Sequence, residues 1–398
     1  MSATPSSPLP PFDAGDPLGL DDLLTDEDRA VRDTVRRWAA DRVLPHIAGW
    51  YERGELPGIR DLARELGSLG ALGMSLTGYG CAGASAVQYG LACLELEAAD
   101  SGIRSLVSVQ GSLAMYAIHR FGSEEQKQRW LPRMASGEVI GCFGLTEPDH
   151  GSDPAGMRTH ARRDGSDWVL NGRKMWITNG SVAGVALVWA ATDDGVRGFV
   201  VPTDTPGFAA PEIHHKWSLR ASVTSELVLD DVRLPADAAL PEVRGLRGPL
   251  SCLSHARYGI VWGSMGAARA SFEAALEYAR TREQFGKPIG GFQLTQAKLA
   301  DMAVELHKGI LLAYHLGRRM DAGRLRPEQV SFGKLNNVRE AIEICRTSRT
   351  ILGANGISLE YPVMRHATNL ESVLTYEGTV EMHQLVLGKA LTGLDAFR

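Results

Sequence analysis

The stretch Trp168-Val169-Leu170-Asn171-Gly172-Arg173-Lys174-Met175-Trp176-Ile177 lies between two long regions that have helical periodicity. An Asn-Gly pair between two apolar runs predicts a β-hairpin with a type I′ turn. Residues 185–191, 198–202 and 225–229 predict further short strands, with Pro and Gly between them. Together these segments predict an all-β module, a barrel or a sandwich, over residues 141–247.

The region before this module, residues 12–140, has a helical pattern. Thr25 followed by Asp28 has the spacing of an N-terminal helix cap, and Ser123 followed by Gln126 has the spacing of a capping box. We therefore expect an N-terminal helical domain.

Helices return after the module. Residues 260–282, 294–322 and 327–352 carry apolar residues at helical spacing, over lengths that favour side-by-side packing. We therefore expect a C-terminal four-helix bundle over residues 248–398. The predicted fold class is α+β and multidomain: a helical domain, a β-barrel or sandwich domain, and a helical bundle. Residues 1–11, rich in Pro and Ser, predict a disordered tail before them.

The composition excludes several classes of protein. A chain of 398 residues predicts two or three domains, and a net charge of −5 gives no electrostatic basis for binding nucleic acid. The five cysteines are scattered without a CxxC motif, which disfavours a zinc site or a disulfide framework and suits a reducing cytoplasm. No apolar run approaches the ~18–20 residues of a membrane span, and the N-terminus does not resemble a signal peptide.

Several standard catalytic motifs are absent from the sequence. It contains no GxGxxG after a predicted strand, no GxxxxGK[ST], no HExxH and no GxSxG. Rossmann nucleotide binding, zinc-protease chemistry and serine acyl transfer are therefore disfavoured. His383 lies shortly after Glu377, but a single His near a helix is more often structural.

One carboxylate stands out, in the segment Thr375-Tyr376-Glu377-Gly378-Thr379. A carboxylate becomes an effective base when apolar surroundings raise its pKa and open space admits a substrate. Tyr376 could supply the apolar surroundings, and Gly378 would let a ligand approach the backbone. Taken by itself, the segment also fits a solvated loop glutamate beside a tight turn.

Two further segments combine apolar and polar groups. In residues 142–154 an apolar entry leads into hydroxyls, glycines and prolines, which could present N–H groups to a heteroaromatic ring or a phosphate. Residues 176–179, Trp-Ile-Thr-Asn, end the predicted hairpin. In isolation the first segment also fits a β-edge loop with helix-capping residues, and the second a buried Trp with a turn Asn.

Taken in order, these segments resemble the acyl-CoA dehydrogenase family over residues 12–398. The markers are Phe143-Gly144-Leu145-Thr146-Glu147-Pro148 with Gly151-Ser152, Trp176-Ile177-Thr178-Asn179, Arg282 and Phe285-Gly286 with Phe292-Gln293, and Asn355-Gly356-Ile357 with Tyr376-Glu377-Gly378-Thr379. Each marker is weak alone, but a chance occurrence of all four in this order is implausible. The resemblance implies the same helix–β–helix fold.

The resemblance also implies an FAD cofactor between the β module and the C-terminal bundle. In the family, the first two markers surround the flavin and the third contacts the FAD of a neighbouring subunit, which implies a homo-oligomer, usually a tetramer. Taken alone, Arg282 also fits a surface cation at a helix end. The implied FAD-binding residues are Phe143, Leu145, Thr146, Gly151, Ser152, Trp176, Ile177, Thr178, Arg282, Phe285, Gln293, Ile351, Leu352, Gly353, Ala354, Thr379 and Glu381.

Glu377 matches the catalytic base of the family. That base removes the α-proton of an acyl thioester while a β-hydride passes to the flavin, and its backbone N–H helps to stabilise the enolate. The implied substrate-binding residues are Glu97, Arg104, Ser105, Ser152, Leu250, Ser251, Cys252, Leu253, Ser254, His255, Ala256, Arg257, Tyr376, Gly378 and Phe397.

The segment Ser101-Gly102-Ile103-Arg104-Ser105 bears on the substrate. A fatty acyl tail needs no cation at the end of its pocket, whereas a buried dicarboxylate does. Arg104 matches the arginine for the distal carboxylate in members that act on glutaryl-CoA, and Glu97 would share its face if the helix is continuous. With Tyr376, the pattern implies conversion of glutaryl-CoA to crotonyl-CoA and CO2. Ile103 departs from the aromatic residue of animal relatives, and a solvated or structural Glu97–Arg104 ion pair is the alternative.

Other functions stay open at this point. They are a dehydrogenase or oxidase for another short or branched acyl-CoA, a substituted glutaryl-CoA as substrate, and a non-catalytic member that acts as a binding partner. Arg104 argues against a monocarboxylic substrate, and Glu377, Thr146, Ser152 and Thr178 argue against a non-catalytic role. By resemblance, the expected electron acceptor is an electron-transfer flavoprotein.

Overall fold

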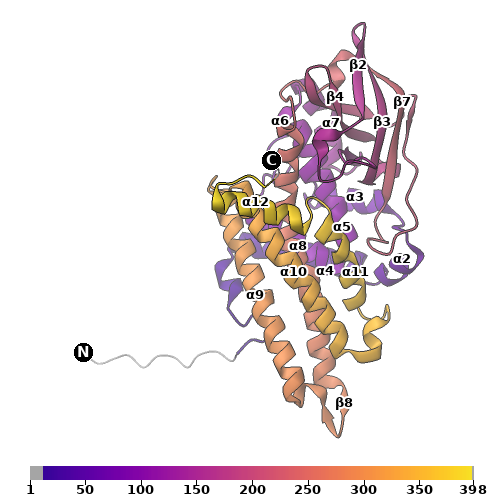
Figure 1. The fold of residues 1–398 in the computed structure, drawn as a ribbon. Coiled ribbons are helices and arrows are strands. Elements are labelled where there is room, and N and C mark those ends of the chain that lie inside the picture. The colour runs from indigo at the N-terminus through magenta and orange to yellow at the C-terminus, as the bar shows by residue number, and fades with distance from the viewer. Residues whose placement is uncertain (1–11, 397–398) are drawn as a thin grey trace.

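The computed structural model describes residues 12–396. The predicted tail at residues 1–11 and the predicted site residue Phe397 lie outside this part. Figure 1 shows a β-sheet at the top of the view, helices of the N-terminal region beside and below it, and long helices that extend away from it. The predicted order of helical, β and helical regions is confirmed, as is the α+β class.

The N-terminal region consists of short helices. Thr25 caps α1 in a capping box with Asp28, and Ser123 caps α7 in a capping box with Gln126, as predicted. The elements are η1 (Leu20–Leu23), α1 (Asp26–Arg42), α2 (Ile47–Arg53), α3 (Ile59–Ser68), α4 (Ala86–Ala99), α5 (Ser101–Ser108), the π-helical η2 (Val109–Met115), α6 (Tyr116–Phe121) and α7 (Glu124–Ala135).

The middle region is one curled sheet of seven strands. Its elements are β1 (Gly141–Gly144), η3 (Pro154–Gly156), β2 (His160–Asp164), β3 (Asp167–Thr178), η4 (Gly180–Val182), β4 (Val185–Thr192), β5 (Gly195–Pro202), β6 (Phe208–Ala209), β7 (Thr224–Leu234) and η5 (Ala236–Ala238). The strand order is β1-β4-β2-β3-β7-β6, with β5 also paired to β4. Both β1 and β2 run parallel to β4, so the chain must cross over between them.

The predicted hairpin turn at Asn171-Gly172 is wrong. β3 runs through this pair and lies between β2 and β7, and Gly172 marks a shift of register against β7. Gly172 has a φ of 148°, and a Cβ there would lie 2.4 Å from the Thr159 hydroxyl oxygen. The glycine therefore serves a β-bulge and a close approach of backbone. The two-residue turn lies instead at Gly165-Ser166, between β2 and β3.

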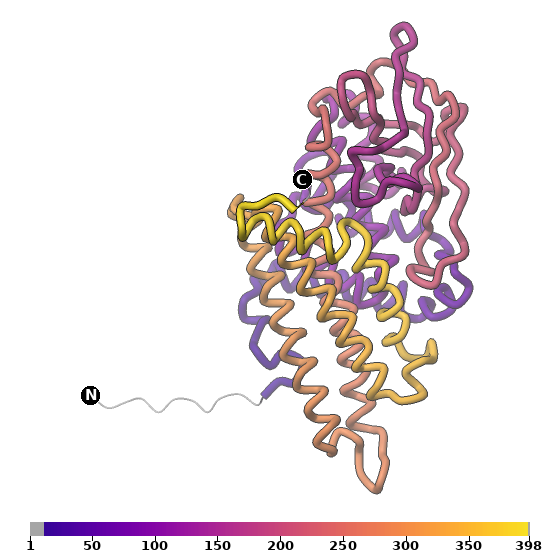
Figure 2. Tube along the Cα trace, viewed as in Figure 1, coloured from indigo at the N-terminus to yellow at the C-terminus, as the bar shows by residue number. Residues whose placement is uncertain are grey.

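The C-terminal region is a bundle of long helices. Its elements are α8 (Arg247–Thr281), β8 (Glu283–Gln284), β9 (Lys287–Pro288), η6 (Ile289–Gly291), α9 (Gln293–Asp321), α10 (Pro327–Ile351), η7 (Gly353–Ile357), α11 (Val363–Thr375) and α12 (Val380–Thr392). Figure 2 shows α8, α9 and α10 running side by side along the bundle. The domain divisions placed after residues 140 and 247 stay predictions.

One hydrophobic core joins the N-terminal helices to the bundle. It contains residues of α1, α3 and α4 together with residues of α8, α9, α10 and α11. Helix α8 approaches α4 so closely that a Cβ on Gly90 would lie 2.3 Å from Trp262 Nε1, and one on Gly266 would lie 2.0 Å from Leu94 O. This packed junction supports the candidate site.

Candidate active site

Glu377 lies in the short loop between α11 and α12. Helix α11 ends because Tyr376 is extended, and the Thr379 side chain caps α12, where Glu381 is exposed. Glu377 has a φ of 52° and Gly378 a φ of 101°. A left-handed conformation costs a non-glycine residue about 1–2 kcal/mol, so the surrounding structure must hold Glu377 in this conformation.

The Glu377 carboxylate combines burial with nearby cations. Its Oε2 atom is buried and has no hydrogen-bond partner among the described residues. Burial raises the pKa of Glu377 above its ordinary value, and the charges of Arg104, Lys334 and Arg257 oppose this rise without cancelling it. A carboxylate with a raised pKa and a free oxygen is suited to act as a general base.

Arg104 is fully buried and paired. Its Nε donates to Glu97 Oε2 at 2.6 Å, and Ser101 Oγ donates to Glu97 Oε1 at 2.9 Å. Arg104 Nη2 also donates to the Tyr376 hydroxyl, next to Glu377 in sequence. Burial alone would lower the pKa of Arg104, but Glu97 and Tyr376 hold it well above its ordinary value. A permanent cation therefore lies beside the candidate base.

Glu97 and Arg104 meet although they are not on one continuous helix. The backbone of Asp100 is extended and separates α4 from α5. The two residues would share a helix face only if the helix were continuous, and it is not. The contact depends instead on the packing of α8, because a Cβ on Gly263 would lie 2.0 Å from Glu97 Oε2. Both side chains are buried, which excludes a solvated ion pair.

Two serines near this pair have unsatisfied hydroxyls. Ser105 Oγ and Ser108 Oγ on α5 are buried and have no partner among residues 12–396. An unsatisfied buried polar atom costs about 1–3 kcal/mol, so such atoms mark a place where a polar ligand would be stabilised. Ser105 is a predicted site residue, whereas the sequence interpretation missed Ser108, one helical turn beyond Arg104.

His383 packs against the loop between α11 and α12. Its Nδ1 lies 3.0 Å from Ser331 Oγ, and a Cβ on Gly378 would lie 2.8 Å from its Nε2. Burial, aided by Lys334 and Arg257, lowers the pKa of His383 to about 3. A neutral, packed ring favours the structural interpretation of this residue.

The loop after β1 and the end of β3 meet on one side of the sheet. Met175 N donates to Thr146 O at 2.8 Å. Trp176 is 58% exposed with a φ of 63°, at a register shift of β3. The alternative of a buried Trp is therefore wrong, and a strained, exposed indole suits the cover of a planar ring. Among the other predicted contacts here, Phe143, Leu145 and Ile177 are buried, Thr146 and Thr178 half-buried, and Gly151 and Ser152 exposed.

Glu147 holds this loop together. Its carboxylate accepts hydrogen bonds from Lys174 Nζ at 2.8 Å, Arg158 N at 2.6 Å and Thr159 N at 2.9 Å. Burial would raise the pKa of Glu147, but these hydrogen bonds lower it to about 2. The carboxylate in the first marker is thus an internal support of the loop.

The remaining predicted FAD contacts lie at the far end of α8. With 35 residues at about 1.5 Å each, α8 is about 50 Å long. Figure 1 shows β8 at the end of the bundle that points away from the sheet. One chain therefore does not bring these contacts to the sheet. Arg282, Phe285, Gln293, Gly353 and Ala354 are exposed there, whereas the side chains of Ile351 and Leu352 are buried.

The predicted acyl-CoA segment, residues 250–257, forms the first turns of α8. Leu250 is exposed, Ser251, Leu253, Ser254, His255 and Arg257 are half-buried, and Cys252 and Ala256 belong to the core. His255 stacks on Tyr116 with 4.4 Å between ring centroids, and its Nε2 lies 3.2 Å from Ser75 Oγ. Arg257 turns towards the loop and donates from Nε to Glu377 O at 2.6 Å.

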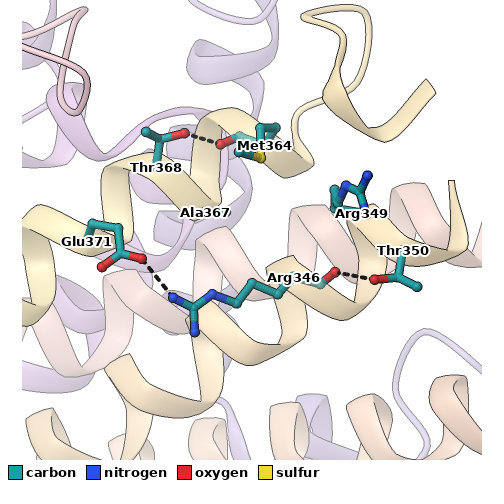
Figure 3. Close-up of a pocket in the computed structure, with 7 residues that line it drawn as sticks. All are labelled: Arg346, Arg349, Thr350, Met364, Ala367, Thr368 and Glu371. Atoms are coloured by element: carbon teal, nitrogen blue, oxygen red, sulfur yellow. Dashed lines mark hydrogen bonds and ion pairs between the residues drawn. The ribbon is translucent and has the colours of Figure 1, made fainter. Parts of the chain in front are cut away.

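A separate cavity lies between α10 and α11. Its volume is about 370 Å³, and its lining is Arg346, Arg349, Thr350, Met364, Ala367, Thr368 and Glu371. Figure 3 shows Arg346 of α10 reaching Glu371 of α11, with 2.8 Å between Nη2 and Oε1. No predicted site residue lines this cavity, so it is distinct from the candidate site.

Residues 12–396 contain neither a candidate metal site nor a candidate membrane span. No group of three or more His, Cys, Asp and Glu side chains in this part could hold a metal ion. No helix in the same part is both long and apolar enough to cross a membrane. All five cysteines are free.

Comparison with known proteins shows the family. Residues 25–138, 142–232 and 243–392 match the N-terminal, middle and C-terminal domains of acyl-CoA dehydrogenase. The chain is 35% identical over 376 residues to the probable acyl-CoA dehydrogenase YngJ of Bacillus subtilis (strain 168), covering 92% of this chain and 98% of the relative. The chain belongs to the acyl-CoA dehydrogenase family.

Two solved structures of glutaryl-CoA dehydrogenase from Mycobacterium smegmatis are similar to this chain. The first has a TM-score of 0.95 and 72% identity, covering 96% of this chain and 99% of the other. The second, in complex with FADH2, has a TM-score of 0.95 and 65% identity, covering 97% and 100%.

Proposed function

We propose that this chain is an FAD-dependent enzyme that converts glutaryl-CoA to crotonyl-CoA and CO2. The observation that carries the proposal is the buried Arg104 guanidinium, which contacts the Tyr376 hydroxyl beside the base Glu377. An uncharged acyl chain gains nothing from a buried cation, whereas a distal carboxylate would pair with it. The two similar structures with 72% and 65% identity are glutaryl-CoA dehydrogenases.

The residues of the β region fit a bound flavin. Trp176 is exposed in a strained conformation next to the loop that carries Thr146, so an aromatic ring system bound there would cover it. When bound, FAD supplies the acceptor for the hydride that leaves the β-carbon.

Glu377 would remove the α-proton of the thioester. Its buried Oε2 has no partner to release first, and its raised pKa favours uptake of a proton from carbon. The backbone N–H of Glu377 would donate to the thioester oxygen, where negative charge develops.

The distal carboxylate would lie against Arg104 and the buried Ser105 hydroxyl, which is close to Tyr376. Loss of CO2 leaves an electron pair on the carbon chain, and protonated Glu377 would return a proton to it, which balances the reaction. Because CO2 leaves as a neutral molecule, the negative charge of the carboxylate moves into the carbon chain and onto the thioester oxygen, where the backbone N–H of Glu377 would stabilise it.

The assembly and the electron acceptor belong to the same proposal. The predicted FAD contacts on the sheet and those around Arg282 lie at opposite ends of the 35-residue α8, which supports a homo-oligomer, a tetramer by resemblance, with FAD bound between copies. An electron-transfer flavoprotein as acceptor and a cytoplasmic location rest on resemblance and on the scattered cysteines.

The test is anaerobic mixing of the flavin-loaded protein with glutaryl-CoA, followed by absorbance and then by mass spectrometry of the acyl products. Loss of flavin absorbance with formation of crotonyl-CoA is expected. Formation of glutaconyl-CoA alone would remove the decarboxylation step. A flavin that stays oxidised with glutaryl-CoA, but is reduced by butyryl-CoA or isovaleryl-CoA, would contradict the proposed substrate.

A further inference from the structure

Three successive carbonyl oxygens of the Glu377 loop accept hydrogen bonds from cations. Lys334 Nζ, from α10, donates to Tyr376 O and to Gly378 O, the latter at 2.5 Å. Arg257 Nε, from α8, donates to Glu377 O at 2.6 Å. The orientation of each peptide plane around Glu377 is therefore fixed by a side chain from another helix.

A lysine is unusual at position 334, because this position lies on a buried face of α10. It is 2% exposed, and the buried Val330 and Val338 lie four residues before and after it, so all three are on one face of α10. Among the described residues Lys334 makes no ion pair within 4.0 Å; its hydrogen bonds go to the two carbonyls, and its Nζ lies 5.7 Å from the Tyr376 ring centroid. An apolar side chain would serve the packing of this face better than a desolvated ammonium.

The two carbonyls that Lys334 binds flank a strained residue. Glu377 has a φ of 52° and Gly378 a φ of 101°, and the direction of the Glu377 side chain depends on both. Without donors on the flanking carbonyls, the loop would be free to relax towards ordinary backbone angles. Relaxation would turn the carboxylate away from the substrate.

We propose that Lys334 is a positioning residue for the base: by binding Tyr376 O and Gly378 O, it presents the Glu377 carboxylate in its left-handed conformation. This inference rests on the proposed role of Glu377. Lys334 does not touch substrate in this scheme and acts through the loop backbone.

Lys334 also belongs to the electrostatic surroundings of Glu377. The charged and titratable groups that face Lys334 are Glu377 and Tyr376 of the loop, Arg104 of α5, Arg257 of α8 and His383 of α12. Burial lowers the pKa of Lys334 to about 7, so Lys334 carries its charge below that pH, and there this charge lowers the pKa of Glu377 against the rise caused by burial. Loss of this cation therefore raises the pKa of the base, a consequence that a purely structural lysine on another face would not have.

The experiment compares Lys334→Met, Lys334→Gln and Lys334→Arg with Lys308→Met, which removes an exposed lysine from α9. For each flavin-loaded variant, anaerobic stopped-flow absorbance gives the limiting rate of flavin reduction by glutaryl-CoA and the apparent Kd. Bound FAD and Tm are measured in parallel, and the rate is repeated with α-deuterated glutaryl-CoA and across pH.

For Lys334→Met the limiting rate is expected to fall about 10- to 100-fold, because a small misplacement of a reacting group has effects of that order. The apparent Kd should change less than about threefold, the deuterium isotope effect should increase, and the acid limb of the rate should move to higher pH. Lys334→Arg, which keeps a donor and the charge, should recover most of the rate, and Lys308→Met should be unchanged.

An unchanged limiting rate in folded, flavin-loaded Lys334→Met or Lys334→Gln would overturn the inference. A rate that falls only in proportion to lost FAD, with no change in isotope effect or pH profile, would also overturn it. If the unsubstituted protein is not reduced by glutaryl-CoA, the proposed substrate fails. The same comparison with butyryl-CoA, which also has an α-proton, then tests Lys334 independently.

Discussion

At the scale of single residues, the candidate site depends on a carboxylate whose backbone conformation and burial both cost free energy. Glu377 is in a left-handed conformation, and its Oε2 is buried without a partner in the described part of the chain. Neither feature stabilises the fold, so both are explained best by the chemistry of a base.

Glu377→Gln is the direct test of that base. The amide is nearly isosteric and cannot accept the proton, so flavin reduction by an acyl-CoA should slow by about 100- to 10,000-fold, the usual contribution of a general base. Bound FAD and Tm should be retained, and Glu371→Gln, an exposed glutamate on α11, is the matched control. A normal reduction rate in Glu377→Gln would remove this residue from the mechanism.

The raised pKa of Glu377 also predicts a pH profile. Only the deprotonated carboxylate acts as base, so the acid limb of flavin reduction should have its midpoint above 4.5, the ordinary value for this group. Because the folded pKa is raised, the folded state binds this proton more tightly than the unfolded state. The contribution of Glu377 to stability therefore falls as pH rises through the folded pKa. A midpoint at or below 4.5 would contradict the burial argument.

At the scale of elements, Asp100 connects the two halves of the site. It separates α4 from α5, accepts from Gly102 N at 2.7 Å, and binds two residues of α11: Arg365 Nη1 at 2.5 Å and Asn369 Nδ2 at 3.0 Å. Helix α5 carries Arg104, and α11 leads directly into Glu377. The distance between Arg104 and Glu377, the proposed selecting cation and base, therefore depends on this buried contact.

Asp100→Ala should lower the free energy of unfolding by about 3–5 kcal/mol, because it leaves the buried Arg365 guanidinium without its carboxylate. Chemical denaturation of the variant measures this loss. Asp61→Ala, which removes an exposed partner of Arg64, should change the same quantity by less than about 0.5 kcal/mol. Equal effects of the two substitutions would show that the Asp100 contact is not a support of the fold.

The elements also show where sequence reasoning works and where it stops. The caps at Thr25 and Ser123 were predictable because a side chain and the backbone three residues later decide them. The Asn171-Gly172 turn failed because pairing with β7 and the close approach of Thr159 outweigh the local turn preference. Such long-range pairing cannot be predicted from a sequence window of ten residues.

The candidate site could be predicted in part from the sequence, for the same reasons. Tyr376, Glu377 and Gly378 stand together in the sequence, whereas the spacing of Glu97 and Arg104 does not explain their contact, because the helix breaks at Asp100 between them. Lys334 was missed, although a lysine midway between Val330 and Val338 on a buried helix face was a signal that could have been noticed. Which carbonyls it binds depends on the fold alone.

At the scale of the whole molecule, the predicted FAD contacts lie in three places. They are on the sheet around Thr146 and Trp176, at the start of α12 with Thr379 and Glu381, and at the far end of the 35-residue α8 around Arg282. In the proposed homo-oligomer, a second copy would bring the contacts around Arg282 to the FAD on the sheet.

Arg282→Ala should therefore weaken FAD binding at least about tenfold, because a charged hydrogen bond contributes about 1.5–3 kcal/mol. This effect is expected although Arg282 is remote from Glu377 in its own chain. Fluorescence titration of the apoprotein with FAD measures the Kd, and light scattering gives the mass of the particle. Arg280→Ala, at the end of α8, is the control. Undiminished FAD affinity, or full flavin loading of a monomer, would contradict the shared site.

The measurement that tests the central claim most directly is the ratio of flavin reduction rates with glutaryl-CoA and butyryl-CoA, before and after removal of Arg104. Arg104→Ala should reduce the ratio at least about 30-fold, since a lost buried charge pair costs about 2 kcal/mol or more. The double variant Glu97→Gln and Arg104→Gln removes both charges of the pair and should show the same loss without an unpaired carboxylate. An equal slowing with both substrates, in either variant, would reduce Arg104 to a structural residue and contradict the assignment of a dicarboxylate substrate.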